Sequence, residues 1–116
     1  MTNVTRASPL VTPVKVAIAN PSTATTTQLV AAVANKKYRV VGLAVVTTLA
    51  NNVNLESDTT DISAVFPLGA NGGVVLPYNE HGWAETNAGE ALQVTTSAAT
   101  AAGVHVLYVE IPVAST

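Results

Sequence analysis

The sequence predicts an all-β protein, an antiparallel β-sandwich or barrel of about eight strands. Two observations carry this prediction. Apolar and polar residues alternate with a period of two in several segments, and Gly, Pro and Asn residues that favour turns separate these segments at short intervals. In addition, Val and Thr are abundant, and branching at Cβ suits a pleated strand better than a helix.

The alternating segments are expected to be half-buried strands. They span residues 14–19, 52–56, 61–66 and 91–96. A shorter apolar run, 74–76, should form a strand that stops at Pro77, because proline has no N–H to donate to a sheet. The segments 29–34 and 97–102 could each form a helical turn, although their small residues and Thr favour strand or loop.

Two further segments, 38–49 and 104–113, are apolar at almost every position. Strands of this kind are covered on both faces. One face belongs in the core, and the predicted fold has no helix to cover the other, so we expect a subunit interface there. The candidate interface residues are Tyr38, Val40, Leu43, Val45, His105, Leu107 and Val109.

Composition limits the domain organisation and the partners. A chain of 116 residues suggests one domain, and we place it at 13–116, after an N-terminal arm at 1–12. Only 10% of residues are charged, which indicates a surface that is partly covered in the working state. The net charge of −2 argues against nucleic-acid binding. Neither a secretory signal nor a stretch long enough to span a membrane is evident, so we expect synthesis in a cytoplasm.

Chemistry-bearing residues are concentrated in one segment, 76–90, which contains the single Trp, one His and three Glu. A metal site using Glu80, His81 and Glu85 lacks a second His at ligand spacing. No nucleophile-elbow pattern accompanies the many Ser residues, and the Glu and Asp residues have little surrounding chain with which to build a glycosidase cleft. We therefore expect no catalytic residue, no metal and no cofactor.

The same segment, together with the glycines just before it, is better explained as a structural loop. Its glycines permit chain reversals, its proline ends a strand, and its Trp offers a large packing surface. The structural-loop residues are Gly72, Gly73, Pro77, Gly82, Trp83 and Gly89.

The second half of the chain resembles a group of small virion proteins of tailed bacteriophages. The resemblance lies in ANGGVVLPYN at 70–79, Gly82-Trp83, TNAGEAL at 86–92 and GVHVLYV at 103–109. It implies a jelly-roll-like β-sandwich that assembles as an oligomer, often a trimer, on the virion exterior. It also implies a capsid decoration (cement) protein or a head-fibre component, and it offers no catalytic residues to transfer.

The leading hypothesis is therefore a non-enzymatic decoration protein that self-associates, binds the major capsid protein or another virion protein, and stabilises the phage head. The arm would contribute to attachment through Val4, Arg6, Pro9 and Leu10. The alternative is a receptor- or glycan-binding knob of a head or tail fibre, with Tyr78, His81 and Trp83 at the binding surface.

Overall fold

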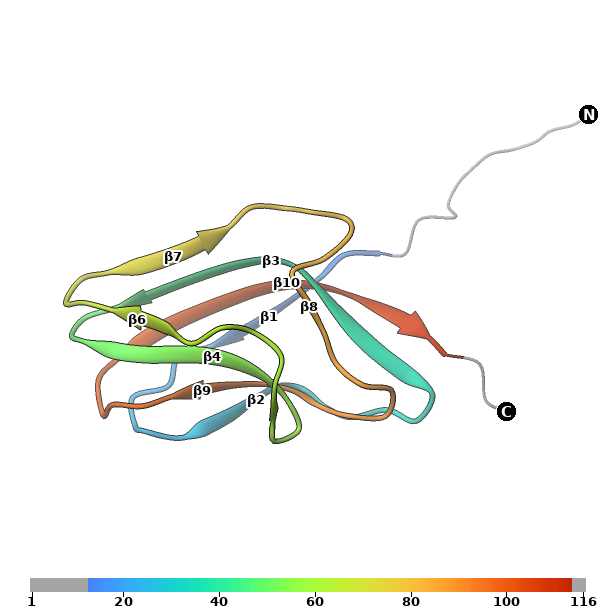
Figure 1. Ribbon diagram of the computed structural model, residues 1–116, viewed down its shortest axis with the longest axis horizontal. Helices are drawn as coiled ribbons and strands as arrows, with labels where there is room; N and C mark the ends of the chain where they lie inside the picture. Colours follow the sequence, from blue (N-terminus) through green and yellow to red (C-terminus); the bar gives the residue numbers. More distant parts are fainter. Residues whose placement is uncertain (1–12, 114–116) are drawn as a thin grey trace, which may run out of the picture.

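The computed structural model describes residues 13–113, which form two antiparallel sheets packed face to face (Figure 1). Sheet A contains, in spatial order, β1 (Lys15–Ala19), β10 (Ala102–Pro112), β3 (Lys36–Thr47) and β7 (Gly73–Leu76), and β8 (Ala84–Glu85) pairs with β3 beyond the end of β7. Sheet B contains β2 (Thr26–Val30), β9 (Leu92–Thr96), β4 (Asn51–Ser57) and the short strands β5 (Thr60–Asp61) and β6 (Phe66–Leu68), which both pair with β4. The residues of the predicted arm, 1–12, and the last three residues lie outside the described part of the chain.

The strand order has the pattern of a jelly roll. The first strand pairs with the last, β1 with β10, and the second pairs with the last but one, β2 with β9. The next strands inward, β3 and β4, continue the same wrapping in sheets A and B. Because β8 extends the position of β7, and β5 and β6 share one edge, about eight strand positions remain. The predicted antiparallel, jelly-roll-like sandwich is confirmed.

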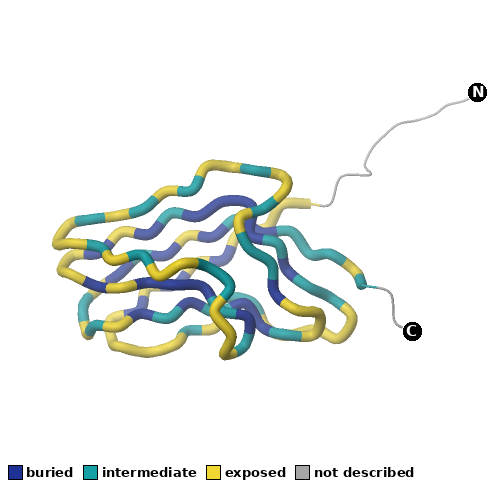
Figure 2. The backbone as a smooth tube through the Cα atoms, in the orientation of Figure 1, coloured by how far each residue is buried: buried dark blue, intermediate teal, exposed yellow. Residues whose placement is uncertain are grey.

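The core lies between the two sheets and is formed by buried residues of both. Figure 2 colours the backbone by residue burial. Branched aliphatic residues supply most of it, and the central members are Val40, Leu43, Val45, Val53, Leu55, Leu92, Val94, Val104 and Val106. At one end Tyr38 packs edge-on against Tyr108, with ring centroids 5.6 Å apart. The Tyr38 hydroxyl donates to the Ala31 carbonyl oxygen over 2.6 Å, and burial is the main reason that its pKa is raised.

A β-bulge in β3 changes which residues face the core. Leu107 pairs with Gly42 and Tyr108 pairs with Val40, which leaves Val41 without a partner in β10. An extra residue of this kind shifts the alternation of side chains by one position. As a result, Val40 and Leu43 both point into the core although they are three residues apart.

The segment 61–66 does not form the continuous strand that its alternation predicts. Strand β5 ends at Asp61 and β6 begins at Phe66. Between them the Leu55 N–H donates to the Ser63 hydroxyl over 2.8 Å, and Ile62 N–H donates to the Leu55 carbonyl oxygen over 3.0 Å. A side-chain hydroxyl therefore takes the place of a sheet partner and lets the chain bend.

Candidate functional site

The loop between β7 and β8 is fastened to β3 at both ends. Asn79 N–H donates to the Val41 carbonyl oxygen over 2.8 Å, and Trp83 N–H donates to the Val40 carbonyl oxygen over 2.7 Å. Inside the loop, the Asn79 side chain accepts from His81 N–H over 2.9 Å. Gly82 has a φ of 87°, and a Cβ there would come within 2.4 Å of the Arg39 side chain. The turn therefore requires glycine at position 82.

Trp83 fastens the same loop from its outer side. Its indole Nε1–H donates to the Pro77 carbonyl oxygen over 2.8 Å, and 43% of the residue remains exposed. The sequence suggested that Trp83 is a packing anchor, and the structure assigns it a half-exposed position instead. It bridges the two ends of the loop and leaves part of its ring at the surface.

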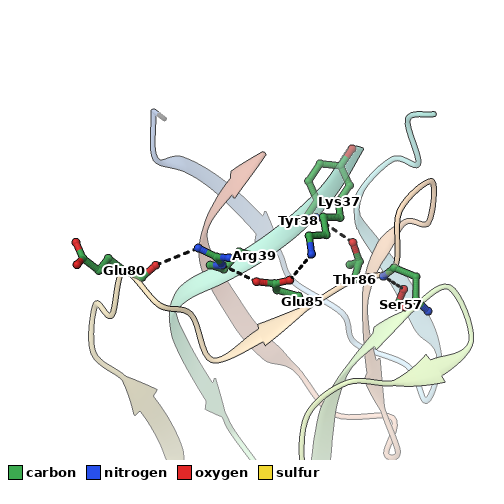
Figure 3. A network of polar contacts seen from close by, with 8 residues as sticks. Lys37, Tyr38, Arg39, Ser57, Glu80, Glu85 and Thr86 are labelled. Carbon is green, nitrogen blue, oxygen red and sulfur yellow. Dashed lines mark hydrogen bonds and ion pairs between the residues drawn. The ribbon is translucent and has the colours of Figure 1, made fainter. Parts of the chain in front are cut away.

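A small ionic cluster joins the loop to β3 (Figure 3). Glu85 accepts from Arg39 Nε over 2.6 Å with one oxygen and lies 2.8 Å from Lys37 Nζ with the other. Arg39 also donates weakly to the Glu80 carbonyl oxygen over 3.5 Å. Hydrogen bonds from Lys37 and then from Arg39 lower the pKa of the Glu85 carboxyl. Lys37 and Arg39, two neighbouring basic residues of β3, are thus both paired with Glu85 at this site.

The segment after β8 clamps sheet A to sheet B. On the side of sheet A, Tyr38 N–H donates to the Thr86 hydroxyl over 2.9 Å, and Thr86 N–H returns a bond of 2.9 Å to the Tyr38 carbonyl oxygen. On the side of sheet B, the fully buried Ser57 hydroxyl accepts from Asn87 N–H over 2.9 Å and donates to Glu90. With its donor and one acceptor position used and no surface exposed, this hydroxyl ties the segment after β8 to sheet B.

The structural-loop residues take these architectural positions. Gly72 N–H closes a turn with the Gly69 carbonyl oxygen over 2.9 Å. At Gly73, a Cβ would come within 2.7 Å of the Val45 carbonyl oxygen, so β7 can lie against β3 only with glycine there. Gly89 N–H donates to the Lys36 carbonyl oxygen over 2.8 Å. Gly82 and Trp83 likewise shape and fasten the loop, and Pro77 also lines a shallow hollow on the outer side of sheet A.

The outer face of sheet A is apolar and has no covering layer within residues 13–113. Its central row contains one residue from each of β1, β10, β3 and β7, namely Ile18, His105, Ala44 and Val75. The rows on either side add more apolar side chains. We call this surface the apolar face and define it as Val16, Ile18, Ala44, Val46, Val75, His105 and Leu107. Ile18 is 64% exposed and Val75 is 69% exposed. Tyr78 and Trp83 lie at its margin on the adjoining loop, and both are exposed.

The predicted interface residues divide between two sides of sheet A. Tyr38, Val40, Leu43 and Val45 point into the core of the single chain and are almost completely buried, so they are unavailable to a partner. His105, Leu107 and Val109 are not in that core, and the first two belong to the apolar face. A single interface cannot contain both groups.

The sequence also misplaced the side chains of β1. A half-buried strand at 14–19 would be expected to bury its larger apolar residues, Val16 and Ile18, whereas the structure buries Ala17 and Ala19 and exposes the larger residues. Both sets are apolar, so the pattern offers no signal that distinguishes them. Val46 and Val75 were missed for the same reason, since their neighbours in sequence are apolar as well.

Two shallow hollows lie on the apolar face, each of about 230 Å³. The first lies over Gly42 and Ala44, between Leu107 and the side chains of Val75 and Tyr78. The second lies over Gly103, between Ile18 and Val46. Ala44 and His105 line both, so the two hollows adjoin at this pair. The hollows exist because glycine and alanine occupy positions where neighbouring strands carry branched side chains.

The outer face of sheet B has the opposite character. Its central rows consist of polar residues, namely Thr26, Gln28, Asn54, Glu56, Asp61, Gln93 and Thr95. Several pair with one another across the strands. The hydroxyls of Thr26 and Thr95 are 2.8 Å apart, and the Asn54 side chain donates to Asp61 over 2.8 Å. This face resembles an ordinary solvated sheet surface.

A second ionic cluster lies near the end of β10, where the Glu110 carboxylate is 3.6 Å from Lys15 Nζ and 3.8 Å from Lys36 Nζ. Between residues 13 and 113, no three His, Cys, Asp or Glu side chains gather in a way that could hold a metal ion. His81 is largely exposed, with Glu80 3.9 Å away as its ion-pair neighbour. No helix in that range is long and apolar enough to cross a membrane. The predicted arm residues Val4, Arg6, Pro9 and Leu10 lie outside the described residues.

No protein-family model matches this chain, and no curated protein is detectably similar to it in sequence. A proposal for its function therefore rests on the apolar face and on the loop between β7 and β8.

Proposed function

We propose that this chain is a non-enzymatic structural protein of a phage virion, which self-associates and decorates the outer surface of the capsid. In this role it binds the major capsid protein or another virion protein and stabilises the head. The protein needs no cofactor for this function, because the work consists of surface contacts.

The observation that carries the proposal is the apolar face. Soluble monomers rarely expose contiguous apolar patches of more than a few hundred Å². Here the side chains from Val16 to Val75 extend across all four strand positions of one sheet, while sheet B has a polar outer face. A protein with one solvated face and one apolar face is suited to assembly.

The virion part of the proposal rests on the resemblance in sequence. Gly73, Gly82 and Trp83 belong to the resembling segments, and their roles in the structure are architectural. This agrees with a family whose shared loop is structural. The jelly-roll order of strands is also the fold that the resemblance implies.

The decisive experiment is to delete the coding sequence from the phage that carries it and to purify the particles. We expect wild-type virions to contain the protein in many copies on the capsid exterior, visible by electron microscopy. Particles without it should assemble and lose their DNA at a lower temperature, and adding the purified protein should restore heat resistance. Absence of the protein from wild-type virions would refute the proposal.

A fibre knob that binds a glycan or a receptor is the second candidate. One observation favours it: Tyr78 and Trp83 are both exposed on one loop, as in a surface for stacking sugars. Binding on a glycan array that Trp83→Ala abolishes and His105→Ala preserves would support the knob. Absence of any glycan signal, together with capsid binding, would favour decoration.

A further inference from the structure

We propose that the apolar face packs against the same face of another copy of this chain, with Ala44 and His105 near the symmetry axis. This inference deepens the proposed function, which includes self-association, by assigning the contact surface. It names the occupant of the face as a further copy of the protein, in preference to the capsid.

The size of the face fits such a contact. Val16, Ile18, Val46 and Val75 are each between 51% and 69% exposed, with Tyr78 and Trp83 at the margin, so a second copy would cover a continuous apolar surface like the centre of a standard interface, which buries roughly 800 Å² per partner. A stable association of small domains needs an area of this order. The face is also built on regular strands, so little conformational entropy is lost when it is covered.

The distribution of charge favours a like partner. Within the apolar face the sole titratable side chain is His105, so two copies can meet without placing like fixed charges together. The nearest ionic groups on this side, Lys37, Arg39 and Glu85, pair with one another at one end of sheet A. They form a polar boundary of the kind that surrounds the apolar centre of protein interfaces.

The shape of the apolar face also favours a second copy of this chain as the partner. Ile18 and Val75 project at opposite edges of the sheet, and the two hollows lie on either side of the pair Ala44 and His105. In a two-fold contact centred on this pair, the same apolar surface of each copy lies against the other, so apolar side chains are covered by apolar side chains. Such self-complementarity is what an isologous contact requires.

Cross-linking tests the contact directly, because the chain contains no Cys. In Ala44→Cys, the thiols of two copies should be joined by a bis-maleimide that spans roughly 10 Å, the spacing of packed sheets. The matched control is Asn52→Cys, an exposed position on the outer side of β4 in sheet B. We expect covalent dimers from Ala44→Cys and almost none from Asn52→Cys. Equal yields from both variants would overturn the proposal.

Charge insertion gives the second test. Light scattering of the purified full chain should report a mass of at least two chains of 11.8 kDa. Ala44→Glu should weaken the association at least tenfold, because the carboxylate would be buried in an apolar contact. Val65→Glu, at a 50% exposed position before β6, should leave the mass unchanged. Far-UV circular dichroism should show the same fold in both variants.

Two results of the light-scattering experiment would also overturn the inference: a wild-type monomer at micromolar concentration, or an Ala44→Glu variant that associates as the wild type does. Either can be distinguished from failure of the proposed function. A monomer found on virions refutes the contact and leaves decoration intact, whereas an oligomer absent from virions refutes decoration and leaves the contact intact.

Discussion

The two outer faces of this sandwich belong to sheets with the same architecture and differ completely in chemistry. On sheet A the central row reads Ile18, His105, Ala44 and Val75. On sheet B an equivalent row reads Gln28, Gln93, Glu56 and Asp61. The inner faces of both sheets are apolar, and they suffice to build a core. The difference marks the outer side of sheet A as an apolar surface that the folding of one chain leaves uncovered, and it supports the contact proposed above.

The largest expected effect comes from comparing the stability lost on truncating Leu55 with that lost on truncating Leu107. Leu55 faces the core from sheet B, and Leu107 lies on the apolar face of sheet A. In an Ala44→Glu background, which keeps association out of the measurement, Leu55→Ala should lower the free energy of unfolding by about 3 kcal/mol. Leu107→Ala should lower it by less than about 1 kcal/mol. Urea denaturation measures both, and equal losses would break the comparison.

Trp83 tests the border of the apolar face. Because 43% of the residue is exposed, Trp83→Ala should cost about 1.5 kcal/mol, below the range for a fully buried Trp. Trp83→Phe should recover part of this loss by restoring packing, without the hydrogen bond to the Pro77 carbonyl oxygen. Thermal unfolding of both variants provides the measurement. A cost above about 3 kcal/mol would mean that Trp83 belongs to the core.

The ionic cluster beside the apolar face provides a pH-dependent prediction. Lys37 and Arg39 hold the pKa of Glu85 below its usual value of 4.5. The folded state therefore gains stability from the ionised carboxylate above pH 4.5, and this gain is lost as pH falls through the lowered pKa. Wild type should exceed Glu85→Gln by on the order of 1 kcal/mol at pH 6, and the difference should shrink toward pH 3.

The matched control for this prediction is Glu80→Gln, because the Glu80 side chain is largely exposed and has only His81 as a neighbouring ion. Its stability relative to wild type should change little over the same pH range. A pH dependence as large as that of Glu85→Gln would assign the acid response to general charge and not to the cluster.

The smallest expected effect is that of a substitution on the polar outer face of sheet B. Thr95 lies on the outer face of sheet B, and its hydroxyl is 2.8 Å from that of Thr26. Thr95→Val should change the free energy of unfolding by less than about 0.5 kcal/mol, because Val has a similar shape and suits a strand. The solubility of the protein should be unchanged. A large stability loss would show that polarity on this face serves folding as well as solvation.

The sequence predicted the sandwich because its signals are local. Alternation in 91–96 identified β9, and the two doubly apolar segments identified β3 and β10, which turn out to be neighbours in sheet A. The jelly-roll wrapping came from the resemblance, since local periodicity contains no information about which strands pair. The segment 61–66 shows the limit of alternation, because a bend held by the Ser63 hydroxyl produces the same pattern as a strand.

The location of the candidate site could be predicted only in part. From Val40 to Val46 strand β3 has no polar residue to mark its outer face, so hydropathy alone cannot tell whether Val45 or Val46 faces inward. The bulge at Val41 then exchanges the two sides within one strand. For this reason the expected interface combined inward residues of β3 with outward residues of β10. The pairing register of the folded sheet, which periodicity does not contain, decides which side chains face outward.

The loop between β7 and β8 has a consequence for protein engineering. Backbone hydrogen bonds to Val41 and Val40 secure its two ends, and the Glu80 and His81 side chains at its tip are largely exposed. A peptide inserted between these two residues would begin and end at fixed points, and lengthening a closed loop costs little. The sandwich would then serve as a display scaffold, and if the chain decorates a capsid, each particle would present the guest sequence in many copies.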